Sequence, residues 1–189
     1  MTPDDWAVLG TLRAEAALSR PDLLGEPVAA ALKALDPAEA ARVGVAEIDP
    51  ALADTAAFCA AYGSAMESSA NCVVVAGRRG GEVRHAACLV LATTRADVNS
   101  MVRKRLSARR ASFAAIDEAV ALTGMEYGGI TPIGLPEGWP VLIDAAVAAA
   151  PAVVVGSGVR HSKLAVPGDL VAALPDAEVM PGLGRPVDA

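Results

Sequence analysis

Aromatic residues and metal-binding side chains are scarce in this sequence. The 189 residues include two tryptophans, two tyrosines, two phenylalanines and two histidines, and aromatic residues make up 3% of the chain. So few rings leave little to stack on unpaired bases, which argues against a platform for single-stranded nucleic acid. With two histidines and no Cys-x-x-Cys pair, we expect no structural zinc site, and nothing indicates another cofactor.

Cysteine is also rare. Cys59, Cys72 and Cys88 are an odd number at wide spacings, and each lies in an apolar run. This pattern is typical of reduced, buried thiols rather than of a disulfide framework. Reduced thiols are usual in the cytoplasm, where we expect the protein to be.

The chain has neither an excess of positive charge nor a long apolar segment. Sixteen Lys+Arg against 22 Asp+Glu give a net charge of −6, so we expect no general binding of polyanions such as DNA, although a local basic patch could still contact RNA. The first five residues are acidic where a secretory signal would be positive. The longest apolar stretch, 141–156, contains Asp144 and Pro151 and is shorter than the ~20 residues of a spanning helix, so we expect no membrane partner.

Apolar material for a core is abundant. Hydrophobic residues make up 53% of the chain, most of them alanine and valine. The length is typical of one domain, because domains commonly have ~100–200 residues. We therefore expect residues 1–189 to form a single domain.

Short helices and strands alternate irregularly along the sequence. Residues 71–93 predict a hairpin, since a β-branched run is followed by the turn sequence Gly77–Gly81 and a second apolar run. The other predicted elements are helices at 4–18, 27–35, 54–63, 97–106 and 116–122, strands at 43–48, 139–143, 152–155 and 163–166, and a last helical turn at 168–174. This mixture favours an α+β fold with a mixed sheet.

The loop 127–134, Tyr-Gly-Gly-Ile-Thr-Pro-Ile-Gly, is the segment most suggestive of function. Gly128 and Gly129 allow positive φ and let bare N–H groups approach a ligand. Pro132 fixes its own φ and biases Thr131 toward an extended conformation. Stiff N–H groups of this kind can stabilise an oxyanion or position a water, but the same residues also suit an ordinary tight turn.

The loop and the segments around it resemble the YbaK/EbsC family, which includes the editing domain of bacterial prolyl-tRNA synthetase and its free-standing relatives. The resemblance rests on the helix end Ala121–Gly124, the loop 127–134, the strand Val141–Asp144 and the strand with its small-residue turn, Val153–Gly158. With the helix at 54–63 and the hairpin before them in the expected order, it covers residues 43–175. An N-terminal helical extension, 1–42, and a loose tail, 181–189, are expected around this core.

The resemblance implies a mixed, largely antiparallel curved sheet or partly open barrel with short helices around it. It also implies hydrolysis of misacylated tRNA, with the loop formed by Gly128, Gly129, Ile130, Thr131 and Pro132 holding the aminoacyl ester and positioning a water. No metal, cofactor or nucleophilic side chain is needed for that chemistry. The implied partners are a misacylated tRNA and an aminoacyl-tRNA synthetase, and the protein is expected to be a monomer or a homodimer.

One position departs from the family. Where the family carries a lysine at the start of the first hairpin strand, this chain has Asn71, which can form hydrogen bonds but carries no charge. Two functions therefore stay open. The protein is either a trans-acting aminoacyl-tRNA deacylase with Asn71 in its site, or a YbaK-like protein that binds aminoacyl-tRNA or a small aminoacyl-like ligand without hydrolysis.

Residues near the later strands are further candidates for substrate binding. They are Asp144, Gly156, Ser157, Gly158, His161 and Lys163. For His161 and Lys163 the favoured interpretation is a solvated surface side chain, with a place in the amino-acid pocket as the alternative. Asp144 either orients the loop or only ends its strand.

A single basic cluster interrupts the acidic sequence: Arg103, Lys104, Arg105, Arg109 and Arg110. These residues could bind tRNA phosphates, which would make binding strongly dependent on salt. They could equally be a solvated helix end whose charges complement the helix dipole. A third possibility is a docking surface for a protein partner.

Overall fold

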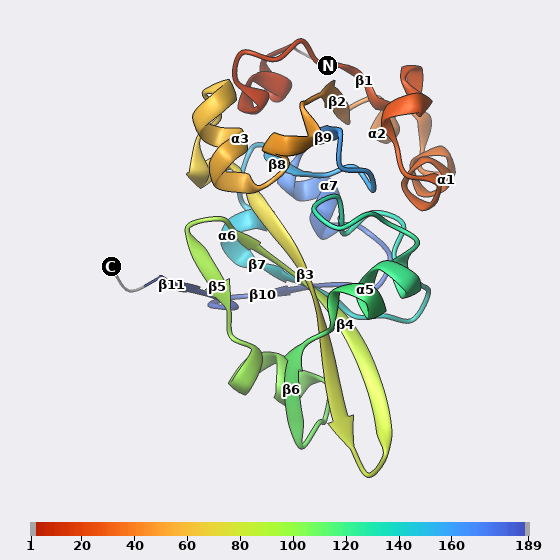
Figure 1. Cartoon of the computed structure of the whole chain (residues 1–189), viewed down its shortest axis with the longest axis vertical. Coiled ribbons are helices and arrows are strands. Elements are labelled where there is room, and N and C mark those ends of the chain that lie inside the picture. The colour runs from red at the N-terminus through yellow and green to blue at the C-terminus, as the bar shows by residue number, and fades with distance from the viewer. Residues whose placement is uncertain (1–2, 188–189) are drawn as a thin grey trace.

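Two β-sheets and a peripheral strand pair, with short helices around them, make up residues 3–187, the part of the chain that the computed structural model describes (Figure 1). The expected α+β class is confirmed, and neither sheet closes into a barrel within these residues. In the same range, no helix is both long enough and apolar enough to cross a bilayer.

The larger sheet is built on the predicted hairpin. Its strands in spatial order are β10 (Ala177–Met180), β7 (Val141–Asp144), β4 (Glu82–Leu91), β3 (Ala70–Arg79) and β6 (Arg110–Phe113). Strands β3 and β4 are antiparallel and are joined by Gly80 and Gly81, both at positive φ, which is the conformation that a two-residue hairpin turn requires. Strand β6 pairs antiparallel with β3, whereas β7 lies parallel to β4.

The smaller sheet is antiparallel throughout. Its strands in spatial order are β1 (Glu15–Ala16), β2 (Gly44–Glu47), β9 (Ser162–Val166) and β8 (Val153–Gly156). All residues of β8 and β9 are buried. A parallel bridge between Ser69 and Val154 brings the start of β3 against β8, and this contact joins the two sheets.

Helices are short and lie around the sheets. The α-helices are α1 (Glu26–Ala34), α2 (Pro37–Ala40), α3 (Thr55–Tyr62), α4 (Arg103–Arg105), α5 (Ile116–Thr123), α6 (Ala145–Ala148) and α7 (Gly168–Ala172). A π-helical turn, η6 (Val98–Val102), leads into α4, and the 3-10 turns are η1 (Pro3–Leu9), η2 (Ala17–Ser19), η3 (Pro21–Leu23), η4 (Pro50–Leu52) and η5 (Met66–Ser68). Helices α3 and α5 end at left-handed Gly63 and Gly124, the glycines at which the sequence predicts their ends.

The largest apolar cluster fills the space between the two sheets and α1. Val28, Leu89, Ile143 and Leu164, from four different elements, contribute side chains that are fully buried. Small branched side chains let these backbones pack closely, as the composition suggests.

The N-terminal segment differs from the prediction of a helix at 4–18. Its 3-10 turn ends at Leu9, because Gly10 has a φ of +70° and lies so close to Tyr62 that a Cβ would be 2.0 Å from the Tyr62 carbonyl oxygen. The Thr11 amide then donates to that oxygen at 2.8 Å. A contact with α3 thus overrides the local helical periodicity, and the segment goes on to add strand β1 to the smaller sheet.

The expectation of a loose tail at 181–189 is wrong for residues 184–186. They form β11 (Gly184–Pro186), which pairs antiparallel with β5 (Thr94–Ala96), and the Gly184 amide donates to the Asp144 carboxylate at 2.7 Å. Residues 188–189 of the predicted tail lie outside the described residues.

Candidate functional site

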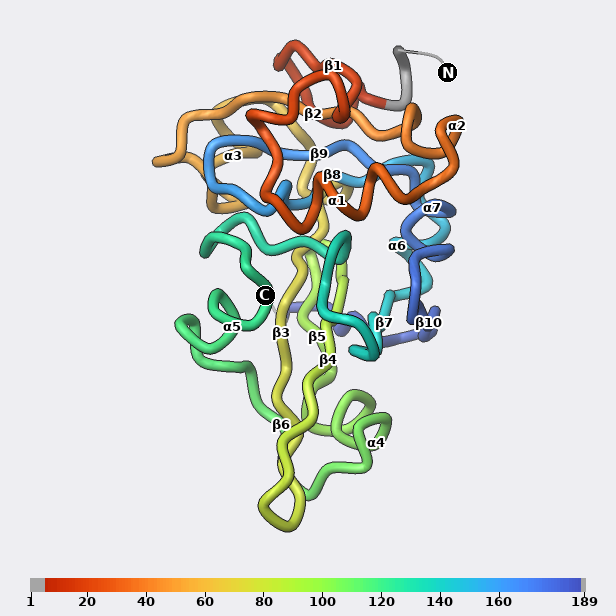
Figure 2. Tube along the Cα trace, turned by 90° about the vertical axis from the view of Figure 1, so that its right-hand side faces the viewer, coloured from red at the N-terminus to blue at the C-terminus, as the bar shows by residue number. Residues whose placement is uncertain are grey.

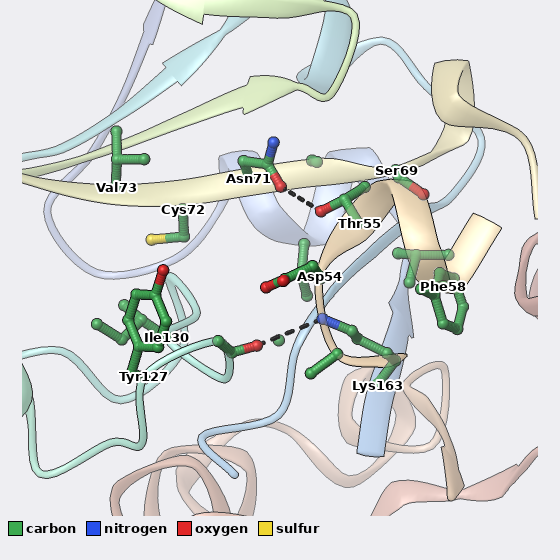
Figure 3. A pocket seen from close by; sticks show the side chains of 16 residues that line it. Asp54, Thr55, Phe58, Ser69, Asn71, Cys72, Val73, Tyr127, Ile130 and Lys163 are labelled. Atoms are coloured by element: carbon green, nitrogen blue, oxygen red, sulfur yellow. Dashed lines mark hydrogen bonds between the residues drawn. The ribbon is translucent and has the colours of Figure 1, made fainter. Parts of the chain in front are cut away.

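A cavity of about 290 Å³ lies where the two sheets meet (Figure 3). It is bounded by the start of α3, the start of β3, the loop before Thr131, and strands β8 and β9. The residues that line it include Asp54, Thr55, Phe58, Ser69, Asn71, Cys72, Tyr127, Gly128, Ile130, Gly156 and Lys163. The cavity therefore combines residues that are far apart in the sequence.

The glycine loop is held in place by the turn that follows β8. The Gly158 amide donates to the Gly129 carbonyl at 2.8 Å, and the Glu126 amide donates to the Gly158 carbonyl at 2.9 Å. The two backbones are so close that a Cβ on Gly129 would be 2.5 Å from the Val159 carbonyl oxygen, and one on Gly156 would be 2.3 Å from that of Gly129. Both glycines are therefore required sterically, whatever their part in chemistry.

The main-chain amides of the loop differ in whether they are already paired. The Gly129 amide is used within the turn, where it donates to the Glu126 carbonyl at 2.9 Å. By contrast, the amides of Gly128 and Ile130 donate to no residue within 3–187. Because Gly128 and Ile130 also line the cavity, their unpaired amides lie beside the space that a ligand would fill.

Thr131 and Pro132 lie away from this cavity. Thr131 is fully buried, and its hydroxyl has no hydrogen-bond partner in the described part of the chain. Pro132 lines a different, more apolar cavity with Ile133 and Trp139. The five-residue loop expected from the sequence is thus divided between two regions of the structure.

Asn71 enters the cavity from β3. Its side-chain oxygen accepts a hydrogen bond from the Thr55 hydroxyl at 2.7 Å, which anchors the side chain to the first turn of α3 (Figure 3). Its amide nitrogen donates to no residue that the structure places. Asn71 and Gly128 therefore share one cavity, although the sequence separates them widely.

Lys163 is buried, so the favoured interpretation of a solvated strand residue is wrong. Its side chain is 7% exposed, because β9 is a central strand covered by its neighbours. The ammonium lies 3.4 Å from the Gly128 carbonyl oxygen and 5.9 Å from the centre of the Phe58 ring (Figure 3).

Burial also changes the ionisation of Lys163. Loss of solvation is the main effect and lowers the pKa of Lys163 from 10.5 to about 8, while the Asp54 carboxylate partly opposes that change. At neutral pH the side chain is therefore still mostly charged, and it places a cation with little exposed surface of its own at the wall of the cavity.

Residues 49–173 match the family model of the aminoacyl-tRNA editing domain. The chain belongs to this family. The match confirms the resemblance to the YbaK/EbsC proteins that the loop and its flanking strands indicate.

Solved structures share the fold of this editing domain. A proposed trans-editing enzyme for prolyl-tRNA synthetase is 20% identical with a TM-score of 0.68, and the alignment covers 83% of this chain and 94% of that one. A scaffold from computational epitope grafting has the same identity and TM-score, with 83% and 95% covered. A hypothetical protein is 21% identical with a TM-score of 0.64, and the alignment covers 75% of this chain and 90% of that one. No curated protein sequence matches the chain.

Within the editing domain, one of the three predicted site residues at 156–158, where β8 ends and the next turn begins, lines the cavity. Gly156 lines it, whereas Ser157 is buried and its hydroxyl is 2.6 Å from that of Ser162. Gly158 has a φ of +87° and shapes the turn that holds the loop. The imidazole of His161 lies outside the cavity, 3.3 Å from the Asp22 carbonyl oxygen.

Asp144 has a structural position in the larger sheet. It ends β7, its carboxylate accepts from the Ala146 amide at 2.9 Å and so caps α6, and it also holds Gly184. Asp144 does not line the cavity. Of the two interpretations left open for it, the end of a strand is the one that the contacts support.

Several cavity residues were not predicted as site residues. Asp54 is the first residue of the helix predicted at 54–63, but its carboxylate caps no amide of α3 and instead faces the cavity (Figure 3). Tyr127 is half exposed at the rim, with the Arg160 guanidinium 5.8 Å from its ring centre. The position of Tyr127 directly before the two glycines was a usable signal, whereas nothing in the local sequence indicates that Phe58 lines a cavity.

Cys72 differs from the other two cysteines. It lines the cavity and is partly exposed, whereas Cys59 and Cys88 are buried, and none of the three forms a disulfide. Its apolar surroundings raise the pKa of the Cys72 thiol, which keeps it protonated at neutral pH. Within residues 3–187, no three His, Cys, Asp or Glu side chains are arranged to share a metal ion.

The unpartnered hydroxyl of Thr131 predicts an effect on stability. Thr131→Val keeps the shape and removes a buried polar group without a partner, so the free energy of unfolding should rise by about 1 kcal/mol. Thr123→Val is the matched control, because the buried Thr123 hydroxyl donates to the Ala119 carbonyl at 2.8 Å and this variant should be destabilised. Urea unfolding measures the stability of both variants. An equal loss of stability in the two would show that the Thr131 hydroxyl does have a hydrogen-bond partner.

Burial of Lys163 predicts a stability that depends on pH. Between pH 8 and 10.5 the unfolded chain keeps the proton that the folded protein releases, so wild-type stability should rise with pH over this range. Lys163→Met has no ammonium at this position and should therefore lack this rise of stability with pH. The variant should be more stable than wild type at pH 7, by about 3 kcal/mol, and the advantage should disappear by pH 10.5.

Lys33→Met, which changes an exposed lysine, should show no such trend over the same urea titrations. A difference between Lys163→Met and wild type that stays constant from pH 7 to 10.5 would mean that Lys163 is solvated.

Proposed function

We propose that this editing domain is a trans-acting deacylase that removes a mischarged amino acid from tRNA by hydrolysing the aminoacyl ester. The observation that carries the proposal is the shared cavity, where the Lys163 ammonium, the Asn71 amide and the free amides of Gly128 and Ile130 surround one space. The family match supports editing of aminoacyl-tRNA as the class of reaction.

The size of the cavity suits the ester rather than the whole nucleotide. At about 290 Å³ it is at the lower end of the range for small-molecule sites, roughly 300–1,000 Å³, and accommodates an aminoacyl group. The terminal adenosine would then remain outside, near the exposed ring of Tyr127. Asp54 provides a carboxylate on the cavity wall that can pair with the α-ammonium of the amino acid.

The reaction is addition of water to the ester carbonyl. The bond from the carbonyl carbon to the ribose oxygen breaks, the ribose oxygen takes the proton released by the water, and the products are a free amino acid and a tRNA with its terminal hydroxyl restored. Negative charge develops on the carbonyl oxygen in the transition state. Hydrogen-bond donors already fixed in place stabilise this charge most effectively where water is excluded, as around the buried Lys163.

Lys163 supplies the charge that Asn71 lacks. The two side chains come from different sheets, β9 and β3, and line the same cavity. Asn71 can donate a hydrogen bond to the ester or to a ribose hydroxyl, and Lys163 adds a cation beside the loop amides. On this proposal, loss of the family's lysine from β3 is compatible with hydrolysis.

The central test is incubation of the protein with a panel of misacylated tRNAs. Wild type should release amino acid, and Lys163→Met should lower kcat by about 10²-fold, the effect of removing one donor to a developing oxyanion. Lys33→Met, a surface change, should leave the rate unaltered. If no tRNA in a broad panel is turned over at high protein concentration, the enzyme proposal fails.

The alternative is a protein that binds aminoacyl-tRNA, or a small aminoacyl-like ligand, without hydrolysis, and the uncharged Asn71 favours it. Asn71→Lys separates the two functions. If Lys163 already provides the cation, this variant should be no faster than wild type, because a second ammonium would face Lys163 and the hydrogen bond with Thr55 would be lost. Activity that appears only in the variant would support the binding protein.

The identities of the tRNA and the amino acid follow from the same panel. Association with an aminoacyl-tRNA synthetase, a cytoplasmic location, and the choice between monomer and homodimer remain predictions from the sequence.

A further inference from the structure

The far end of the larger sheet carries a groove lined by arginines. The groove has a volume of about 590 Å³, and its charged residues are Arg78 from β3, Arg103 from α4, and Arg109 and Arg110 at the start of β6. No carboxylate lines it. All four arginine side chains are exposed, although the chain as a whole has a net charge of −6.

These four guanidinium groups have no acidic partner among the residues that the structure places. Other arginines do: Arg105 pairs with Glu178, Arg42 with Asp169 and Glu39, and Arg84 with Glu82. The Glu118 carboxylate is bound to His85 at 2.9 Å, and this contact, with a smaller effect of Arg78, lowers the pKa of Glu118. The groove is therefore a region where positive charge is left uncompensated.

The strand register concentrates this charge further. Arg78 and Arg110 are directly opposite each other in the antiparallel β3–β6 pair. Like charges in that position destabilise a sheet, so the protein alone gains nothing from the arrangement. A bound polyanion would relieve the repulsion, and the edge position of β6 leaves the pair accessible.

Strand β3 connects this groove to the catalytic cavity. Asn71 lies in the cavity and Arg78 lies in the groove, seven residues further along the strand, which corresponds to about 23 Å at ~3.3 Å per residue. Figures 1 and 2 show the strand running from beside α3 down to β6. A stacked strand rises about 3.4 Å along its axis per nucleotide, so the span corresponds to roughly seven nucleotides.

We infer that the arginine groove binds backbone phosphates of the substrate tRNA, several nucleotides before the ribose whose ester lies in the cavity. This inference rests on the proposed function and adds to it the surface that holds the nucleic acid. It also changes the set of tRNA-binding residues that the sequence predicts. Arg78 is added, while Lys104 and Arg105 fall outside the groove and Arg105 is held by Glu178.

The test compares a long and a short substrate. The double variant Arg78→Gln/Arg109→Gln should lower kcat/KM for misacylated tRNA tenfold or more at ~0.15 M salt, and should reduce the slope of log affinity against log salt by about two. Hydrolysis of 3′-aminoacyl-adenosine should not change, because a single nucleoside cannot span the distance to the groove. Arg13→Gln/Arg95→Gln removes the same charge from exposed positions elsewhere and should behave as wild type.

The outcomes separate this inference from the proposed function. If the groove variant hydrolyses tRNA as well as wild type does, or loses activity equally on both substrates, the groove is not the phosphate-binding surface although the enzyme proposal stands. If wild type hydrolyses neither substrate, the enzyme proposal fails and fluorescence anisotropy with uncharged tRNA still tests the groove. In the anisotropy measurement, a weaker and less salt-dependent affinity of the groove variant for tRNA supports the inference. An unchanged affinity overturns it in favour of a protein-docking surface.

Discussion

The close contact between the glycine loop and the turn after β8 is the constraint on which the candidate site depends. A Cβ on Gly156 would clash with the Gly129 carbonyl, and a Cβ on Gly129 would clash with the backbone of Val159, so neither position has room for a side chain. The Gly158 amide and the Gly129 carbonyl close the contact with a hydrogen bond. Because this pairing fixes Gly129, the amides on either side of it remain free and are held rigid beside the cavity.

The buried position of Lys163 lowers the stability of the fold while it strengthens the electrostatic effect of the ammonium in the candidate site. Placing an ammonium in a central strand costs free energy, and the same loss of solvation lowers the pKa of Lys163. The same burial would make the charge more effective toward a polar ligand, since electrostatic interactions are stronger where water is excluded. The bridge between Ser69 and Val154 completes the arrangement, because it brings Asn71 on β3 to the cavity that Lys163 enters from β9.

Charge is distributed unevenly over the molecule. Several arginines near the smaller sheet are paired with carboxylates, whereas the four that line the groove at the end of the hairpin are not. A protein with a net negative charge repels nucleic acid in general, so a localised basic surface allows binding in one orientation only. The long β3–β4 hairpin separates this surface from the cavity and holds the two at a constant distance.

The sequence by itself determined the α+β class, the hairpin, the glycine ends of α3 and α5, and the family, because β-branched runs, turn residues and helix caps act through neighbours close in the chain. It also located the loop and the position of Asn71. Only the tertiary structure decided that Lys163 is buried in the cavity, that Thr131 and Pro132 lie outside it, and that Gly10 interrupts a helical pattern. Solvent exposure and the nearest charges of these residues are set by segments distant in sequence, and local patterns carry no information about such contacts.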